Sequence, residues 1–227
     1  MKGILATKRQ RTIVNMLEEA YTLHRVTREP IHVVEGAVPP VFFDTRRHEA
    51  RRPLIVTGSR DDEPRSVELI AQLAVLLSGD DLQVAFNWIG RLGSASVARL
   101  KAANVGYFEA SDDAEIALRL ACGWLYLAPR SGPPGFPVFV AAAMALGLPC
   151  AVIGSPEHSD LIRDGETGFL CRTDNEVMRC IGRLIDEPLL RKQIGQAARR
   201  EAENRFSPGR FRDSLFSAYE LDVQTGY

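Results

Sequence analysis

The residues best suited to chemistry in this chain of 227 residues form a loop that could hold a phosphate group. Arg130 and Gly135 bracket the loop, which leads into an apolar segment predicted to be a helix over residues 137–146. A helix begins with unpartnered backbone N–H groups that attract phosphate, and a glycine lets the backbone approach closely. Pro137 removes one possible donor near the first turn. The loop therefore predicts phosphate binding, and the alternative is a rigid turn that feeds a buried helix.

Two further cations, Arg60 and Arg65, follow a short apolar run at residues 54–57. Guanidinium groups stabilise the negative charge of phosphates because they offer several N–H donors with a fixed positive charge. Three acidic residues, at positions 61–63, lie between the two arginines and would repel a phosphate. Two interpretations follow, a phosphate-binding loop and a solvated loop whose charges neutralise one another.

These loops are placed by an alternation of strands and helices that begins near residue 53. Short apolar runs predict strands over residues 31–34, 54–57, 82–86, 105–108, 124–128, 150–153 and 169–170. Helical periodicity predicts helices over residues 66–77, 95–103, 112–120, 137–146, 174–185, 188–204 and 208–221. Strands and helices that alternate through short loops are typical of an α/β fold with a parallel sheet covered on both faces. Ligands of such sheets bind outside the carboxyl ends of the strands.

The N-terminal region differs from this alternation. Residues 8–27 carry an apolar stripe at helical spacing, and Pro30 ends it, because the residue before a proline avoids the helical conformation. We therefore expect a helical extension over residues 1–30 and a single Rossmann-like domain over residues 31–227. The stripe predicts packing on this domain or on a partner, with binding to a membrane surface as the alternative.

Composition restricts the class of protein. The chain is 45% hydrophobic and 25% charged with a net charge of −1, which is typical of a soluble globular protein. The charge balance argues against a nucleic-acid partner, and no apolar run approaches the roughly 20 residues of a transmembrane segment. The four cysteines lack C-x-x-C spacing and predict reduced thiols in a cytoplasmic protein. A zinc site from Cys171, Cys180 and a histidine is the alternative.

Residues 135–149 carry the most specific pattern, G-F-P-V-F-V-A-A-A-M-A-L-G-L-P. The pattern resembles the donor-site segment of the two-domain (GT-B) glycosyltransferases, above all the retaining enzymes of family 4, in which it runs E-G-F-G-x-x-x-x-E-A-M-A-x-G-x-P. The family's second glycine is Pro137 here. The places of its two glutamates are held by Pro134 and Ala142.

Further pieces of the family pattern follow in the same order along the chain. They comprise I-H-V-V-E-G-A-V at 31–38, G-S-R at 58–60, Y-F at 107–108, L-Y-L-A-P at 125–129, D-G-E-T-G-F-L at 164–170 and R-F-S at 205–207. The resemblance runs from about Ile31 to Tyr219 and covers the half that binds the donor nucleotide. It implies one Rossmann-like domain and leaves the acceptor-binding half unmatched.

The resemblance implies a set of binding residues. In the family, an arginine and a lysine hold the donor diphosphate. Ser59 stands at the arginine position, Arg60 is one place off and Arg65 matches the lysine. Asp160 stands where the family has the glutamate of its G-G-x-P-E segment. Together with the loop described first, the expected donor-binding residues are Arg60, Arg65, Arg130, Gly135 and Asp160, with no metal ion and no cofactor beyond the nucleotide-sugar substrate.

The resemblance implies a glycosyltransferase-like protein that binds a nucleotide-sugar and transfers a hexose-type sugar. An acceptor-domain subunit or a homodimer would complete the cleft. Because Pro134 and Ala142 offer no side-chain hydrogen bond, and a site built for such a bond loses orders of magnitude without it, the alternative is an inactive scaffold that binds a partner. We also expect His158 to lie at the surface, with a general base as the alternative, and Trp88 and Arg91 are candidates to stack on a base.

Overall fold

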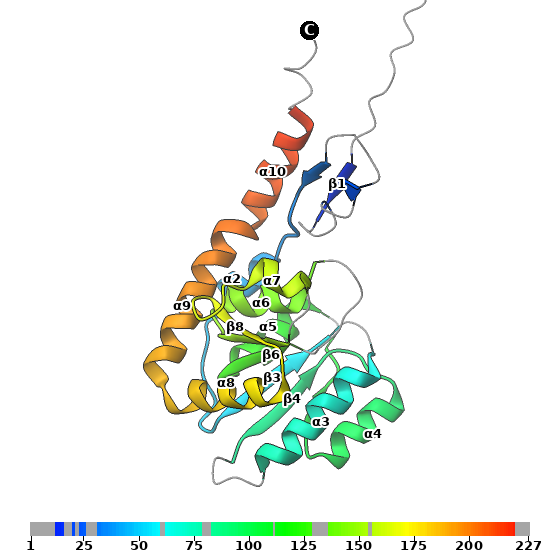
Figure 1. Cartoon of the computed structure of the whole chain (residues 1–227), viewed down its shortest axis with the longest axis vertical. Helices are drawn as coiled ribbons and strands as arrows, with labels where there is room; N and C mark the ends of the chain where they lie inside the picture. The colour runs from blue at the N-terminus through cyan, green and yellow to red at the C-terminus, as the bar shows by residue number, and fades with distance from the viewer. Residues whose placement is uncertain are drawn as a thin grey trace, which may run out of the picture.

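The computed structural model describes residues 12–15, 20, 23–25, 31–59, 62–78, 83–110, 112–128, 136–153 and 156–220. Its centre is a six-stranded parallel sheet with the strand order β5-β4-β3-β6-β7-β8 (Figure 1). The strands are β3 (Leu54–Gly58), β4 (Ala85–Ile89), β5 (Gly106–Phe108), β6 (Leu125–Ala128), β7 (Cys150–Ile153) and β8 (Gly168–Cys171). The order reverses between β3 and β6, as in doubly wound folds. The predicted α/β fold is confirmed.

Helices cover both faces of this sheet (Figure 1). One face packs against α3 (Pro64–Ser78), α4 (Ser94–Ala102) and α8 (Asp174–Asp186). The other packs against α2 (Pro40–Asp44), α5 (Asp113–Ala121), α6 (Val138–Leu146) and α9 (Pro188–Arg205). The remaining helices are α7 (Pro156–Leu161), after β7, and α10 (Pro208–Glu220), which follows α9 and extends beyond the body of the domain.

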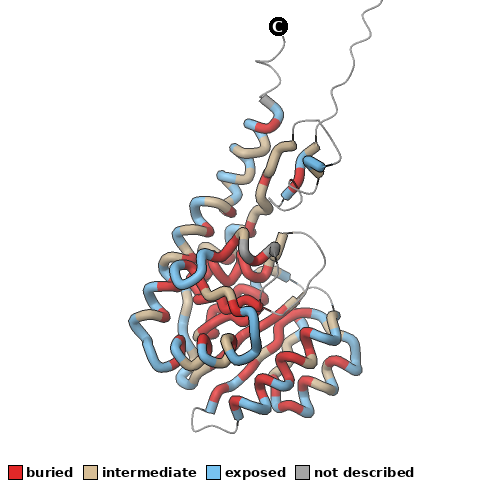
Figure 2. The backbone as a smooth tube through the Cα atoms, viewed as in Figure 1, coloured by how far each residue is buried: buried red, intermediate tan, exposed pale blue. Residues whose placement is uncertain are grey.

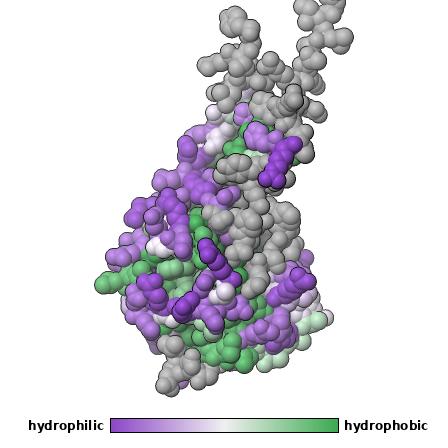
Figure 3. Space-filling model, in the orientation of Figure 1, coloured by the Kyte–Doolittle hydropathy of each residue, from purple (hydrophilic) through white to green (hydrophobic). Residues whose placement is uncertain are grey.

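Burial explains why the central strands read as continuous apolar runs. β3, β6 and β7 are buried along their whole length, as expected for parallel strands covered on both sides. Helix α6 is almost fully buried after its first residue (Figure 2). Its apolar sequence therefore reflects its place in the core. The face seen in Figure 3 mixes hydrophilic and hydrophobic side chains, and the side along α9 and α10 is mostly hydrophilic.

A second, smaller sheet lies beside α10, away from the six-stranded sheet (Figure 1). It consists of β1 (Thr12–Val14) and β2 (Ile31–Val33), which pair in parallel. The predicted helix over residues 8–27 is therefore wrong at residues 12–14, which form a strand that pairs with β2. Most of the remaining residues of that prediction lie outside the described residues, and the domain boundary at residue 30 stays a prediction.

Three local predictions differ from the structure. β4 begins at Ala85, three residues later than expected, because its register is set by pairing with β3, where Leu54 lies opposite Ala85. α2 and α7 form in segments for which the sequence predicted neither a strand nor a helix. Within the described part of the chain, no helix is both long and apolar enough to cross a membrane. In those same residues, no three His, Cys, Asp or Glu side chains are grouped as metal ligands.

Candidate functional site

A pocket opens where the sheet reverses its strand order, at the carboxyl ends of β3, β4 and β5. We call it the edge pocket; its volume is about 550 Å³. Its lining residues come from the segments after these strands and from α5 and α6; they are Ser59, Gly90, Arg91, Ala110, Asp112, Asp113, Ile116 and Phe139. Open α/β sheets bind ligands at such a reversal point. The edge pocket is therefore the candidate functional site.

Two glycines allow the backbone to close around the edge pocket. Gly90 has φ +123°, and a Cβ there would lie 2.2 Å from the carbonyl oxygen of Ser59. A Cβ on Gly58 would lie 2.3 Å from the carbonyl oxygen of Ile89 and 2.8 Å from the ring of Phe139. Such distances are incompatible with a side chain. The ends of β3 and β4 therefore approach each other, and α6, only because both residues are glycine.

A buried tyrosine fixes the end of β3. The Tyr126 hydroxyl, on the neighbouring strand β6, donates a hydrogen bond of 2.9 Å to the carbonyl oxygen of Gly58. Burial raises the pKa of Tyr126 well above its ordinary value, so the phenol keeps its proton. Tyr126 thus holds the point from which the segment after β3 departs.

The N-terminus of α6 borders the edge pocket. Its N-cap is Pro137, and among the described residues no side-chain hydrogen bond caps the helix. Pro137 has no N–H of its own, as expected from the sequence, but the residues of the first turn that follow it keep theirs. Phe139 belongs to that first turn and lines the pocket. The first turn of α6 therefore offers backbone donors and a positive dipole end at one side of the site.

The acidic residues between the two candidate arginines have structural roles. Asp62 accepts hydrogen bonds of 2.7 Å from the Gly93 backbone N–H and from the Ser96 hydroxyl at the start of α4. Glu63 accepts a hydrogen bond of 2.8 Å from the Ser66 backbone N–H at the start of α3. Two of the three acidic side chains expected to repel a phosphate are thus engaged in capping helices.

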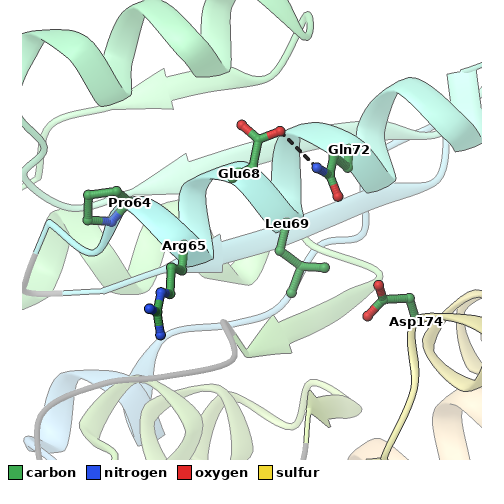
Figure 4. A pocket seen from close by; sticks show the side chains of 6 residues that line it. All are labelled: Pro64, Arg65, Glu68, Leu69, Gln72 and Asp174. Carbon is green, nitrogen blue, oxygen red and sulfur yellow. Dashed lines mark hydrogen bonds between the residues drawn. The ribbon is translucent and has the colours of Figure 1, made fainter.

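Arg65 lies in the first turn of α3, close to the carboxyl end of β3. It lines a groove of about 390 Å³ with Pro64, Glu68, Leu69, Gln72 and Asp174. Figure 4 shows Arg65 and Asp174 at the two ends of this groove with Leu69 between them. Arg65 is exposed, and no hydrogen bond or ion pair with another described residue engages its side chain. It is therefore a cation available near the strand ends.

Asp160, in α7, lies at the end of β7. Its backbone carbonyl accepts a hydrogen bond of 2.9 Å from Arg205 Nη2, and Arg205 also pairs with Glu35 and with Glu201. The Asp160 Oδ2 atom is buried and lacks a hydrogen-bond partner among the described residues. The predicted binding residue is thus near the same edge of the sheet, next to a network that ties together the segment after β2, α7 and α9.

The five predicted donor-binding residues divide into two groups. Arg65 and Asp160 are described and both follow strands at the carboxyl edge. Arg60, Arg130 and Gly135 lie outside the described residues, as does Pro134. Ala142, at the second glutamate position of the resemblance, is buried inside α6 and carries no polar side chain.

Two aromatic predictions are wrong. Trp88 lies inside β4 rather than after it, is fully buried and packs in the core beneath α3 and α4, so it cannot stack on a bound base. His158 is buried in α7 with 7% of its surface exposed, rather than at the surface. Both errors come from misplaced secondary structure. The end of β4 was predicted too early, and α7 was not predicted.

Several residues that line the edge pocket could be predicted only from where they stand, after a strand or before a helix. Asp112 caps α5 by accepting a hydrogen bond of 2.8 Å from the Glu115 N–H, a role that its position before a helix predicts. Arg91 pairs with Glu109 at 3.4 Å, and both side chains are exposed. Because they follow the ends of strands, these residues lie at the ligand-binding edge. Chemically, the edge offers backbone donors and a free guanidinium for an anion beside carboxylates that accept hydrogen bonds.

Comparison with protein families gives a match over the sheet region. The model of the family described as "Glycosyl transferases group 1" matches residues 51–187, which is more than half of the chain. The matched range includes the whole six-stranded sheet and every lining residue of the edge pocket. A search of curated protein sequences found no match.

Several solved structures share the fold of this chain. A glycosyltransferase from Rickettsia africae has a TM-score of 0.80 and 15% identity, covering 96% of this chain and 64% of that one. A mutant of S. aureus TarM in complex with fondaparinux, alpha-GlcNAc-glycerol and UDP has a TM-score of 0.76 and 18% identity, with 91% and 43% covered. The GtfA/B complex has a TM-score of 0.72 and 19% identity, with 93% and 45% covered. The chain thus spans between 43% and 64% of the length of these structures.

Proposed function

The chain belongs to the glycosyl transferases group 1 family, and we propose that it binds a nucleotide-sugar at the carboxyl edge of its sheet and transfers a hexose-type sugar from it. The observation that carries the proposal is the edge pocket, which lies where the strand order reverses and is bordered by the uncapped N-terminus of α6. The TarM structure, which shares the fold, contains UDP. The four free cysteines further support a cytoplasmic protein.

The diphosphate of the donor is assigned to the first turn of α6. Backbone N–H groups there would bind the phosphate oxygens, and Arg65 and Arg130 would supply positive charge. As the glycosidic bond breaks, negative charge grows on the leaving diphosphate, and fixed donors aimed at it lower the barrier. The nucleoside is assigned to the edge pocket, and the proposal needs no metal ion because the cations are side chains.

A second half is proposed to supply the acceptor site. The chain covers only 43% of TarM and 64% of the Rickettsia glycosyltransferase. β1 and β2 form a separate parallel sheet of two short strands, although parallel strands are normally covered on both faces. Ile13 on β1, and Phe216 and Tyr219 on α10, are exposed. We propose that this end of the molecule binds an acceptor-type α/β subunit, or a second copy of the chain.

Calorimetric titration with UDP, GDP, ADP and their sugar conjugates tests donor binding. We expect saturable binding of one nucleotide, weakened about tenfold or more by Arg65→Ala, because a charged hydrogen bond is worth about 1.5–3 kcal/mol. Arg212→Ala is the matched control, since Arg212 is exposed on α10, away from the strand ends. Equal loss in both variants, or unchanged affinity in the Arg65 variant, contradicts the assignment of the phosphate site.

A measurement of molecular mass in solution tests whether a second copy of the chain or a separate subunit completes the cleft. A dimer that becomes monomeric in Phe216→Asp supports completion by a second copy through this end of the molecule. A monomer that binds the nucleotide but transfers no sugar, until an acceptor-type subunit is added, supports a separate subunit. Transfer by the monomer alone contradicts the need for either.

The second candidate function is an inactive scaffold. It is favoured by Ala142, a buried position without a hydrogen-bonding side chain where the resemblance places a ribose-binding glutamate. A folded protein that binds none of the nucleotides would support the scaffold and contradict the enzyme. If the protein bound a nucleotide but transferred no sugar, even with the second half present, then catalysis rather than donor binding would have been lost.

A further inference from the structure

A cysteine and a histidine form a close pair at the edge of the sheet opposite the edge pocket. Cys122 ends α5, and the Cys122 Sγ lies 3.3 Å from the Nε2 of His48. α5 starts at the edge pocket with Asp112 and is nine residues long, so the pair lies about 14 Å away along the helix. Two backbone hydrogen bonds fix the partners, from His48 N to Ala121 O at 3.2 Å and from Ala50 N to Cys122 O at 2.9 Å.

The contacts of His48 determine which of its ring nitrogens can accept a hydrogen bond from the Cys122 thiol. His48 Nδ1 lies 3.4 Å from the carbonyl oxygen of Arg46. Because a carbonyl can only accept, Nδ1 carries the proton in that contact, and neutral Nε2 is left as the acceptor for the Cys122 thiol. The thiol can also donate to the carbonyl of Leu118 at 3.4 Å. A base that is itself oriented by a third group is the arrangement that activates nucleophilic thiols.

Cys122 differs from the other three cysteines in access. It is half-buried, and His48 beside it is exposed, whereas Cys150, Cys171 and Cys180 are 0%, 3% and 6% exposed. Burial also raises the pKa of the Cys150 thiol far above its ordinary value. Reaction needs both a thiolate and access. Among the four cysteines, Cys122 is therefore the most accessible.

The segment that carries His48 is strongly basic. Arg46, Arg51 and Arg52 on this segment are exposed. Arg47 is instead directed inward and donates to the carbonyl oxygens of Gly147 and Gly123 at 2.7 and 2.9 Å. Exposed cations near a thiol favour the approach of negatively charged reagents.

We propose that Cys122 and His48 form a thiol-modification site that exchanges with anionic low-molecular-weight disulfides. His48 Nε2 takes the proton of the Cys122 thiol, and the thiolate attacks one sulfur of the disulfide. A new S–S bond to Cys122 forms as the disulfide's own S–S bond breaks. The other sulfur leaves as a thiolate and takes the proton from His48, so Cys122 is oxidised while half of the disulfide is reduced to a thiol.

The test is incubation of the folded chain with glutathione disulfide at neutral pH, followed by intact mass and peptide mapping. We expect one added glutathione, on Cys122, and none on Cys122→Ser. His48→Gln should slow the addition by about tenfold or more, since positioned bases contribute at least that much. His32→Gln, a change in the small sheet, should leave the rate unchanged. A neutral disulfide, bis(2-hydroxyethyl) disulfide, should react more slowly than glutathione disulfide.

Several outcomes would overturn the proposal. They are addition to a buried cysteine instead of Cys122, no addition to the folded protein, and an equal rate in His48→Gln and the unsubstituted chain. Faster reaction of the neutral reagent would remove the role of the arginines and the anionic specificity. Circular dichroism of each variant shows that the fold is retained, because His48 is exposed and a serine replaces the thiol with little change in size. Nucleotide affinity is a separate measurement.

Discussion

Gly90 decides at the scale of one residue whether the edge pocket can keep its shape. Its φ of +123° is a conformation that residues with a side chain rarely adopt, and a Cβ would lie 2.2 Å from the Ser59 carbonyl oxygen. We expect Gly90→Ala to lower the free energy of unfolding by about 1–3 kcal/mol, the cost of a strained backbone conformation. Urea denaturation measures the change, and nucleotide affinity should fall with it because Ser59 and Gly90 both line the pocket.

Gly182 provides the matched control. It lies inside α8, and a Cβ there would meet no atom within 4 Å. Gly182→Ala should therefore stabilise the protein by up to about 1 kcal/mol, because alanine favours a helix interior. If both alanine variants changed stability in the same direction, the difference in backbone strain that separates the two glycines would be disproved.

At the scale of secondary structure, α3 and α4 are joined by one ion pair. Arg99 Nε lies 2.6 Å from Glu68 Oε2, and Nη2 lies 2.9 Å from Oε1. Arg99, followed by Gln72, lowers the pKa of Glu68 from its ordinary 4.5 to about 2. A carboxylate with a depressed pKa stabilises the folded state above its unfolded pKa, and this contribution is lost as the pH falls through the folded value.

We therefore expect Glu68→Gln to change how stability depends on acid. The unsubstituted chain should lose stability between pH 4.5 and about 2, the window between the two pKa values of Glu68. The variant should be less stable at neutral pH and lose less within that window, so the two proteins converge near its lower end. Urea midpoints across this range give the result. Glu109→Gln, which removes an exposed pair with Arg91, is the control, and identical curves for Glu68→Gln would contradict the pairing.

A helix or strand could be predicted when its own sequence determines it, and could not when its position depends on pairing with another strand. The buried strands β3, β6 and β7 read as apolar runs because both of their faces are covered, and helices α8 and α9 begin at capping or proline signals in the sequence. β4 was misplaced because its ends depend on pairing with β3, and Asn87 inside it breaks the apolar run. β1 was taken for part of a helix, since its two apolar residues, Ile13 and Val14, fit either period and only the partner strand decides.

The candidate site depends on the whole molecule and was predictable only in part. Arg65 and Asp160 could be named because each stands at a position of the family pattern that follows a strand. The edge pocket could not, because it joins segments from Ser59 to Phe139 that meet only through the strand order, which no local pattern encodes. The role of Asp62 after β3 could not be predicted for the same reason, since Asp62 accepts hydrogen bonds from Gly93 and Ser96 at the start of α4, more than thirty residues further along the chain.

The two sheets of the molecule differ in the interactions that stabilise them. The six-stranded sheet is buried between helices on both faces. The small sheet has two strands of three residues, and its links to the body include the Arg205–Glu35 ion pair and the hydrogen bond of 2.8 Å from Val38 N to Phe206 O. Two-stranded sheets are marginally stable alone. The pairing of β1 with β2 should therefore open without unfolding the rest.

Native-state hydrogen exchange measures this difference. The Val34 amide, which donates to Val14 O at 2.8 Å, should exchange at least about tenfold faster than the Tyr126 amide, which donates to Pro149 O at 2.9 Å within the large sheet, because local openings need less free energy than global unfolding. Equal protection would show that both sheets unfold as one unit. If a subunit or a second copy covers the small sheet, its addition should slow exchange at Val34 and leave Tyr126 unchanged, which ties the weak point of the fold to the surface proposed to complete the cleft.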